Sequence, residues 1–126
     1  MKEVVTTSNA PAAVGPYSQA VKAGGLLFVS GQIPLDPQTG QLLTGDIRKQ
    51  AARVMDNLAA VLAAGNLGLD HVTKVTIFLS DMDDFAAVNE VYTAYFEGNP
   101  PARACVQVAR LPKDAEIEIE CVAAYP

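Results

Sequence analysis

The sequence is poor in the residues that build metal sites and covalent Cys–His sites. It has one histidine and two cysteines among 126 residues, and His71 stands in the turn GLDHV with no CxxC or carboxylate–histidine cluster around it. Metal sites need several such side chains at short spacings, so we expect no metal ligands and interpret His71 as a surface or strand-start residue. A mechanism with a covalent Cys–His pair is poorly supported for the same reason.

Long apolar runs and basic runs are absent as well. No segment reaches the length of a membrane span, and MKEVVTTSNAPAAVGPY has neither a signal-peptide core nor the arginine content of a transit peptide. The expected location is therefore cytoplasmic, where Cys105 and Cys121 should be thiols. The nine Lys and Arg residues are scattered and face 14 Asp and Glu residues, which argues against nucleic-acid and anionic-membrane partners.

The chain does have enough apolar sequence for one core. Half of its residues are hydrophobic and 18% are charged, and no repeat or linker interrupts it, so we expect a single domain over residues 1–126. Apolar residues recur at steps of three and four in segments 46–65 and 83–98, which predicts two helices. The first would be capped by Thr44 or Asp46 and would end at a left-handed Gly65. The second carries the polar Asn89 beside its apolar stripe.

Segments rich in β-branched residues predict strands at 3–6, 26–34 and 72–80, and two more within 100–120. The order is strands, helix, strand, helix and two strands. This order favours an α+β fold with one mixed sheet and both helices packed on one face. The opposite face would then be free for solvent, a ligand or another subunit.

The stretch PPARACVQVARLPKDAEIEIE has an unusual distribution of polar residues. We expect a hairpin turning at Leu111 and Pro112, with Val106, Val108, Ile117, Ile119 and Cys121 on the helix side. The free face would then carry a row of polar side chains from both strands, namely Arg103, Cys105, Gln107, Glu116, Glu118 and Glu120. In this register Cys105 lies near Glu120 and Gln107 lies near Glu118.

Each of these polar residues has a chemical and a structural interpretation. The planar fork of Arg103 matches a carboxylate, or it forms a salt bridge to a strand glutamate. Cys105 is a reactive thiol beside a guanidinium, or a small buried hydrophobe. The three glutamates repel one another, so one of them titrates high and activates a water, or all are solvated charge. Tyr17, Ser30 and Gly31 lie at loop edges, where the backbone of Gly31 leaves room for a ligand.

These motifs resemble the RidA family, also called YjgF/YER057c/UK114. The resemblance rests on NAPAAVGPYSQAV, VSGQIPLDPQTG, DFAAVNEVY and the PPARACVQVARLPKDAEIEIE stretch, and it extends from about Asn9 to Ala123. It implies a chorismate-mutase-like α+β fold and a homotrimer with a site at each subunit interface. It also implies hydrolysis of 2-iminobutanoate and 2-iminopropanoate, by-products of pyridoxal-phosphate dehydratases, to 2-oxo acids and ammonia without a cofactor.

The resemblance assigns roles to residues at matching positions. Arg103 would hold the substrate carboxylate, Glu118 would activate the water, and Cys105 and the backbone at Gly31 would line the reacting end. Tyr17, Ser30 and Asn89 would complete the pocket, some of them from the neighbouring subunit. Cys121 has no role in the resemblance and is expected in the core.

Other functions are carried as alternatives. A non-catalytic regulator that binds 2-oxo acids or amino acids would use the same clefts. Endoribonuclease and chaperone-like activities are reported for relatives, and the acidic composition argues against the first of these.

Overall fold

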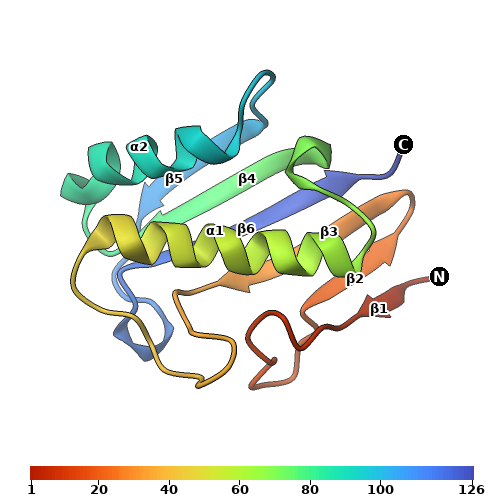
Figure 1. The fold of residues 1–126 in the computed structure, drawn as a ribbon, viewed down its shortest axis with the longest axis horizontal. Helices are drawn as coiled ribbons and strands as arrows, with labels where there is room; N and C mark the ends of the chain where they lie inside the picture. The colour runs from red at the N-terminus through yellow and green to blue at the C-terminus, as the bar shows by residue number, and fades with distance from the viewer.

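The structure, a computed structural model, describes residues 1–126 and has a mixed α+β fold, as the sequence predicts. One six-stranded sheet and two α-helices make up the regular structure (Figure 1). The strands are β1 (Glu3–Val5), β2 (Ala20–Ala23), β3 (Leu26–Gln32), β4 (Val72–Leu79), β5 (Ala102–Gln107) and β6 (Ile117–Ala124). The helices are α1 (Ile47–Ala64) and α2 (Phe85–Tyr95), and three short 3-10 turns lie at Leu69–His71, Met82–Asp84 and Pro112–Asp114.

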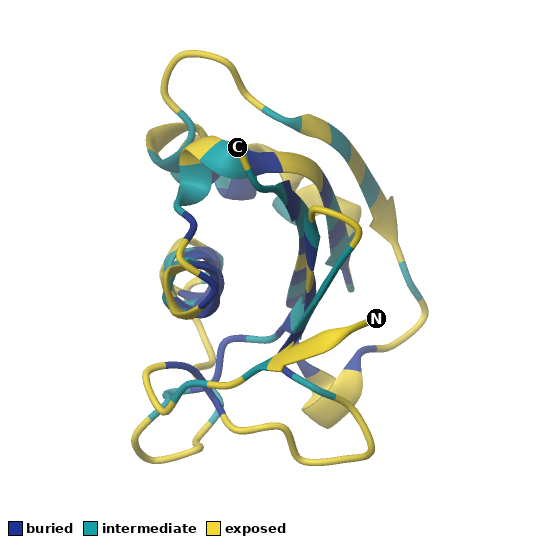
Figure 2. Ribbon diagram, turned by 90° about the vertical axis from the view of Figure 1, so that its right-hand side faces the viewer, coloured by how far each residue is buried: buried dark blue, intermediate teal, exposed yellow.

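The strand order explains why both helices lie on one face. The order is β1-β2-β3-β6-β4-β5, and every neighbouring pair is antiparallel except β4 and β5. Helix α2 connects the parallel pair β4 and β5, and α1 connects β3 to β4 across the intervening β6. Two crossovers of the same hand that step in the same direction place their helices on the same side of the sheet. Figure 2 shows both helices against one face and the other face without a covering helix.

Helix α1 follows the predicted apolar stripe. Val54, Leu58 and Val61 are buried against the sheet, and the Asp46 side chain caps the helix by accepting a hydrogen bond from the Arg48 amide at 2.9 Å. The predicted left-handed Gly65 is wrong, because its φ is −89° and Asn66 takes the left-handed conformation with φ 62°. A Cβ at position 65 would lie 2.7 Å from Leu27 Cδ2, so close packing requires the glycine.

The predicted hairpin of residues 100–120 is also wrong. Strand β5 pairs only with β4, in parallel, whereas β6 enters the sheet between β3 and β4. The cause is the βαβ crossover, which places β5 at the edge of the sheet beside β4. The chain then crosses to the other side of β4, where β6 pairs with β4 and β3.

This topology changes the predicted faces. Arg103 pairs with Val75 and Cys105 pairs with Ile77, so both side chains lie on the helix side of the sheet. Val106 pairs with Phe78, which also pairs with Glu118, so these three side chains share the uncovered face. The predictions for Ile117, Ile119 and Cys121 are confirmed, since all three are buried in the core cluster on the helix side.

The uncovered face combines apolar and acidic side chains. Phe28 is 45% exposed and Val106 is 42% exposed, and the carboxylates of Glu118 and Glu120 emerge from the same side of β6. Neither helix of the structure has the length and apolar character needed to cross a lipid bilayer.

Candidate active site

Arg103 is the second residue of β5, two positions after Pro101, and is held beneath α2. Its Nη1 donates a hydrogen bond to Asn89 Oδ1 at 2.8 Å. Its guanidinium carbon lies 4.8 Å from the ring centre of Tyr92 and 5.6 Å from that of Phe85. We call Arg103, Asn89, Tyr92 and Phe85 the arginine cluster.

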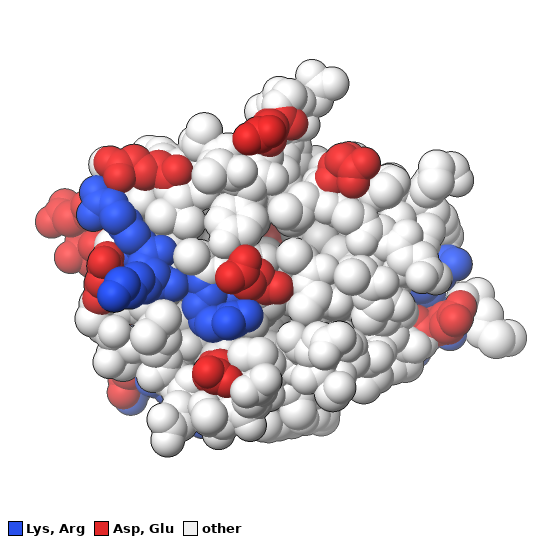
Figure 3. Space-filling model, in the orientation of Figure 1, with Lys and Arg blue, Asp and Glu red and all other residues white.

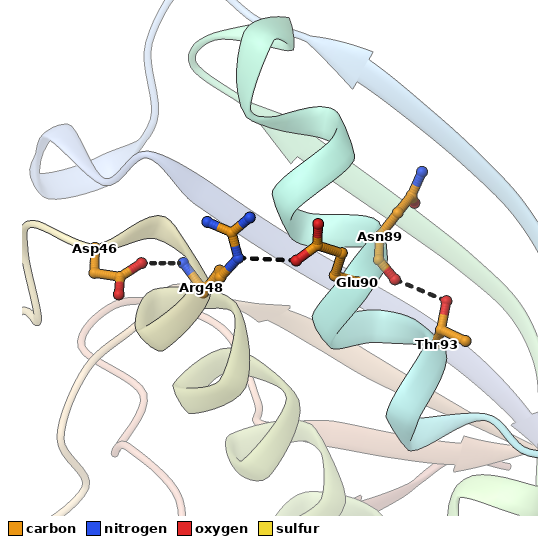
Figure 4. A network of polar contacts seen from close by, with 5 residues as sticks. All are labelled: Asp46, Arg48, Asn89, Glu90 and Thr93. Carbon is orange, nitrogen blue, oxygen red and sulfur yellow. Dashed lines mark hydrogen bonds and ion pairs between the residues drawn. The ribbon is translucent and has the colours of Figure 1, made fainter.

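The spacing along α2 produces this cluster. Phe85, Asn89 and Tyr92 follow one another at steps of four and three, which places them on one helix face. Figure 4 shows Glu90 pointing from α2 towards Arg48 of α1, while the neighbouring Asn89 side chain points away from that ion pair. The carbonyl of Asn89 accepts a hydrogen bond from the Thr93 hydroxyl at 2.8 Å, which is a separate contact of its backbone.

The guanidinium of Arg103 has no acidic partner. The structure contains two arginine–carboxylate ion pairs, Arg48–Glu90 and Arg110–Asp114, and Arg103 takes part in neither. The alternative interpretation of this residue, a salt bridge to a strand glutamate, is therefore wrong. The salt bridge does not form because the inverted face of β5 turns Arg103 away from Glu118 and Glu120. A half-buried cation without a counter-ion costs stability that a bound anion would offset, so Arg103 is a candidate for binding an anion.

Cys105 is half-buried and follows Arg103 on the same face of β5. Burial raises the pKa of its thiol, and the nearby charge of Arg103 opposes that shift. The thiol is thus largely protonated at neutral pH and is a weak nucleophile. His71 precedes β4, six residues before the Ile77 that pairs with Cys105, so it lies roughly 20 Å away along the strand. The expected position of His71 at a strand start is confirmed.

Glu118 lies on the opposite face, in a cavity of about 520 Å³. Tyr17, Ser30 and Gly31 line this cavity, as does Glu120. We call it the glutamate cavity. It brings together four of the predicted site residues, from the loop before β2, the bulge in β3 and strand β6.

The backbone of Gly31 lies directly against the Glu118 side chain. A Cβ built at Gly31 would lie 1.9 Å from Glu118 Oε2 and 2.8 Å from its Cδ, so any side chain at this position would displace the carboxylate. Ser30 is fixed by the hydrogen bond that its hydroxyl donates to the carbonyl of Ser18. The Tyr17 hydroxyl accepts a hydrogen bond from the Val14 amide at 3.4 Å, which holds the loop before β2 against the Tyr17 ring.

The carboxyl of Glu118 has a raised pKa. Burial raises its pKa above the ordinary value, and the charge of Glu120 adds to the shift. A carboxyl with a raised pKa exchanges protons with a bound water more readily near neutral pH. Glu116 differs from the expectation of plain solvated charge, since it lies before β6 and accepts a hydrogen bond at 2.9 Å from the buried amide of Gln50.

The two groups of candidate residues do not meet within one chain. Arg103, Cys105 and Asn89 lie on the helix side at the β5 edge, whereas Tyr17, Ser30, Gly31 and Glu118 lie on the uncovered side. The single cleft walled by Arg103, Cys105 and Glu118 that the hairpin register suggested is therefore absent from the isolated chain. The sheet itself lies between the two groups, and strand β4 separates β5 from β6 because it pairs with both.

Sequence reasoning missed three neighbours of these residues. The sequence pattern assigns Phe85 and Tyr92 to the apolar stripe of α2, and their spacing to Asn89 is the signal that they share its helix face. Lys113 lines the glutamate cavity from a left-handed backbone conformation, with φ 57°. Nothing in its local sequence indicates that conformation.

Comparisons with known proteins cover nearly the whole chain. The family model described as Endoribonuclease L-PSP matches residues 7–125. A RutC family protein of Pyrococcus horikoshii is 55% identical over 123 residues, which is 98% of each chain. The Mus musculus protein named 2-iminobutanoate/2-iminopropanoate deaminase is 46% identical over 123 residues, covering 98% of this chain and 91% of that one. A Thermotoga maritima crystal structure has a TM-score of 0.97 at 53% identity and covers 100% of this chain and 99% of its own.

Proposed function

We propose that this chain, which belongs to the Endoribonuclease L-PSP family and shares it with proteins of the RidA type, hydrolyses reactive 2-imino acids. Water adds to the C=N carbon of 2-iminobutanoate or 2-iminopropanoate, and the resulting carbinolamine loses ammonia to give the 2-oxo acid. An enamine reaches the same path after it gains a proton at carbon. The observation that carries the proposal is the uncompensated, pre-oriented guanidinium of Arg103.

The substrate is small and already electrophilic, so the protein needs to orient it and deliver water. Arg103 would hold the carboxylate through its free N–H groups, since Asn89 accepts from only one of the five. Glu118 would take a proton from the attacking water and return it to the departing nitrogen. One positioned acid–base group of this kind contributes roughly 10²–10⁴-fold to the rate.

The remaining site residues would shape the pocket. The Cys105 thiol and the backbone at Gly31 would line the reacting end, and Tyr17 and Ser30 would close the glutamate cavity around it. None of these roles needs a metal or a cofactor. The expected substrates are released by pyridoxal-phosphate dehydratases, and their removal would protect other proteins from an electrophile.

The two faces of the sheet have a consequence for assembly. If Arg103 binds the carboxylate and Glu118 handles the water, the site must take one residue from each of two copies. A homotrimer with sheet faces turned inward would supply this arrangement. The exposed Phe28 and Val106 on the uncovered face support burial of that face by another copy.

A coupled assay tests the activity. A dehydratase generates the imine in place, and the rate of 2-oxo acid release above the spontaneous rate is measured. We expect Arg103→Ala to reduce release to the spontaneous rate. Release by Arg103→Ala at the rate of the parent would show that the proposed function is wrong.

Mixing two inactive variants tests the shared site. Arg103→Ala and Glu118→Gln subunits are refolded together in equal amounts. If Arg103 and Glu118 of one site come from different copies, about a quarter of the sites regain both residues by random assembly. A site built within a single chain gives no recovery in the mixture.

An endoribonuclease activity is favoured by the description of the family model and by the names given to similar solved structures, and by no feature of this chain's surface. The chain has a net charge of −5. On the helix face, the Lys and Arg side chains that gather over the start of α1 lie among acidic ones, and Arg48 pairs with Glu90 (Figure 3). This surface is a poor match for a polyanion. Tight binding of a 2-oxo acid without imine hydrolysis would instead favour the regulator alternative.

A further inference from the structure

We propose that Phe85 and Tyr92 are positioning residues that fix the plane of the Arg103 guanidinium and leave its charge free for a substrate carboxylate. This inference rests on the proposed role of Arg103 in binding the substrate. The rings themselves need not touch the substrate. Their effect is exerted through the arginine.

The contacts define a constrained setting for the guanidinium. Its carbon lies 4.8 Å from the Tyr92 ring centre and 5.6 Å from the Phe85 ring centre, both within the range of a cation–π contact. Asn89 Oδ1 accepts a hydrogen bond from Nη1 at 2.8 Å. Two rings and one amide thus hold the group from α2, while the β5 backbone holds the other end of the side chain.

All three contacts are neutral, and this is the functional point. A carboxylate in place of any of them would orient Arg103 equally well but would also neutralise it. Aromatic faces and an amide oxygen attract the cation without cancelling its charge. The guanidinium therefore stays oriented and available, which reduces the ordering cost when a carboxylate binds.

The Tyr92 hydroxyl separates the role of the ring from the role of the phenol. Tyr92 is 6% exposed, and its hydroxyl is the one buried side-chain N or O atom without a hydrogen-bond partner. A buried hydroxyl without a hydrogen-bond partner is unsatisfied, and its burial opposes folding. A phenylalanine at this position keeps the ring against Arg103 and removes only the unpaired group.

Binding and turnover test the inference with three variants. The measurements are the Kd for 2-oxobutanoate by calorimetry, KM and kcat for imine hydrolysis, and the melting temperature. We expect Tyr92→Leu to raise Kd and KM about 10-fold with kcat within about twofold of the parent, since a partly desolvated cation–π contact is lost. Tyr92→Phe should restore the parental Kd and KM and melt at a higher temperature. Tyr95→Leu is the matched control, because Tyr95 lies on the same helix and bonds Asp56 and Ala52 instead. Tyr95→Leu should have a lower melting temperature than the parent and an unchanged Kd.

A measurement without substrate keeps this inference separate from the proposed function. The Arg103 Nε–H signal in a ¹⁵N NMR spectrum, assigned by its loss in Arg103→Lys, reports the mobility of the guanidinium. We expect restricted motion in the parent and in Tyr92→Phe, and free motion in Tyr92→Leu. If Tyr92→Leu does not fold, Phe85→Leu replaces it with a smaller effect, about threefold in Kd, because Phe85 is 36% exposed and more distant.

The outcomes are distinguishable. Unchanged Arg103 mobility and Kd in folded Tyr92→Leu would overturn the positioning role. Equal losses in Tyr92→Phe and Tyr92→Leu would overturn it too, because the hydroxyl would then be the active group. A parent protein that neither binds 2-oxobutanoate nor hydrolyses the imine would refute the proposed function, whatever the mobility of Arg103.

Discussion

Replacing Asn89 by aspartate is a direct test of whether Arg103 is kept unpaired in order to bind an anion. Asn89→Asp changes one amide to a carboxylate of nearly the same shape, at a position 2.8 Å from Nη1. The new carboxylate would form a charge-assisted pair with Arg103 that is roughly twice as strong as the neutral hydrogen bond it replaces. We therefore expect the folded protein to tolerate the change and the site to lose its affinity for carboxylates.

The magnitude follows from Coulomb's law. A bound substrate carboxylate on the same guanidinium would lie about 5 Å from the new aspartate, where like charges repel by roughly 1–3 kcal/mol for effective dielectric constants between 80 and 20. The half-buried position of Arg103 favours a middle value of about 2 kcal/mol, which corresponds to about a 30-fold weaker Kd.

Calorimetry with 2-oxobutanoate measures this effect directly, and the coupled assay should show the same increase in KM with little change in kcat. Asn89→Ala is the control, because it removes the oxygen without adding charge and should weaken binding only by about threefold, as expected for one neutral hydrogen bond. Equal affinities of Asn89→Asp and the parent would refute the reasoning, since they would show that the substrate carboxylate does not rest on Arg103.

Further predictions concern the other site and packing residues. Glu118→Gln should lower kcat about 100-fold, the scale of one lost general base. Because burial raises the folded-state pKa of Glu118, ionisation of this carboxyl lowers the stability of the parent as pH rises through that pKa. The melting temperature of Glu118→Gln should therefore exceed that of the parent at neutral pH and equal it in acid. A lower melting temperature of Glu118→Gln at pH 7 would contradict this sign. Gly31→Ala should abolish turnover in a folded protein, because its Cβ would displace the Glu118 carboxylate; parental kcat would show that this carboxylate is not needed where it lies. Alkylation of Cys105, followed by mass spectrometry, should still accelerate above pH 9, and a plateau by pH 7 would disprove the raised pKa. Gly65→Ala should lower the free energy of unfolding by about 1–3 kcal/mol through overpacking, measured by urea denaturation, and an unchanged midpoint would mean that the neighbouring leucine yields freely.

Local sequence patterns were sufficient for the two helices and for strands β3, β4 and β6, but not for the interior strand β2, which lies in a segment that the glycines and prolines mark as loop. The three-and-four spacing of Val54, Leu58 and Val61 defines α1 because a helix repeats its faces at that interval. The β-branched run of β4 and the apolar alternation of Ile117 and Ile119 likewise identify strands that pack under the helices. These signals are local, and the structure confirms them.

Strand pairing was not accessible in the same way. Segments 102–107 and 117–124 are close in sequence, which favoured a hairpin, but β6 gains pairing on both of its edges by inserting between β3 and β4. The choice between the two arrangements depends on contacts across the whole sheet. No residue in the connecting segment 108–116 reports it.

The inverted face of β5 has a different origin. Its binary pattern places alanine and valine on the uncovered side and Arg103 on the helix side, the reverse of what burial alone would select. Violations of that rule concentrate at functional sites, where a polar group is held for its chemistry. Under the proposed function, both halves of the inversion have one explanation: the apolar side of β5 would contact another copy, and its polar side presents Arg103, which has no acidic partner and is held by α2. A change that restores the ordinary pattern, such as Arg103→Leu, should therefore stabilise the isolated fold while removing carboxylate binding, and a drop in its melting temperature would show that Arg103 supports the fold itself.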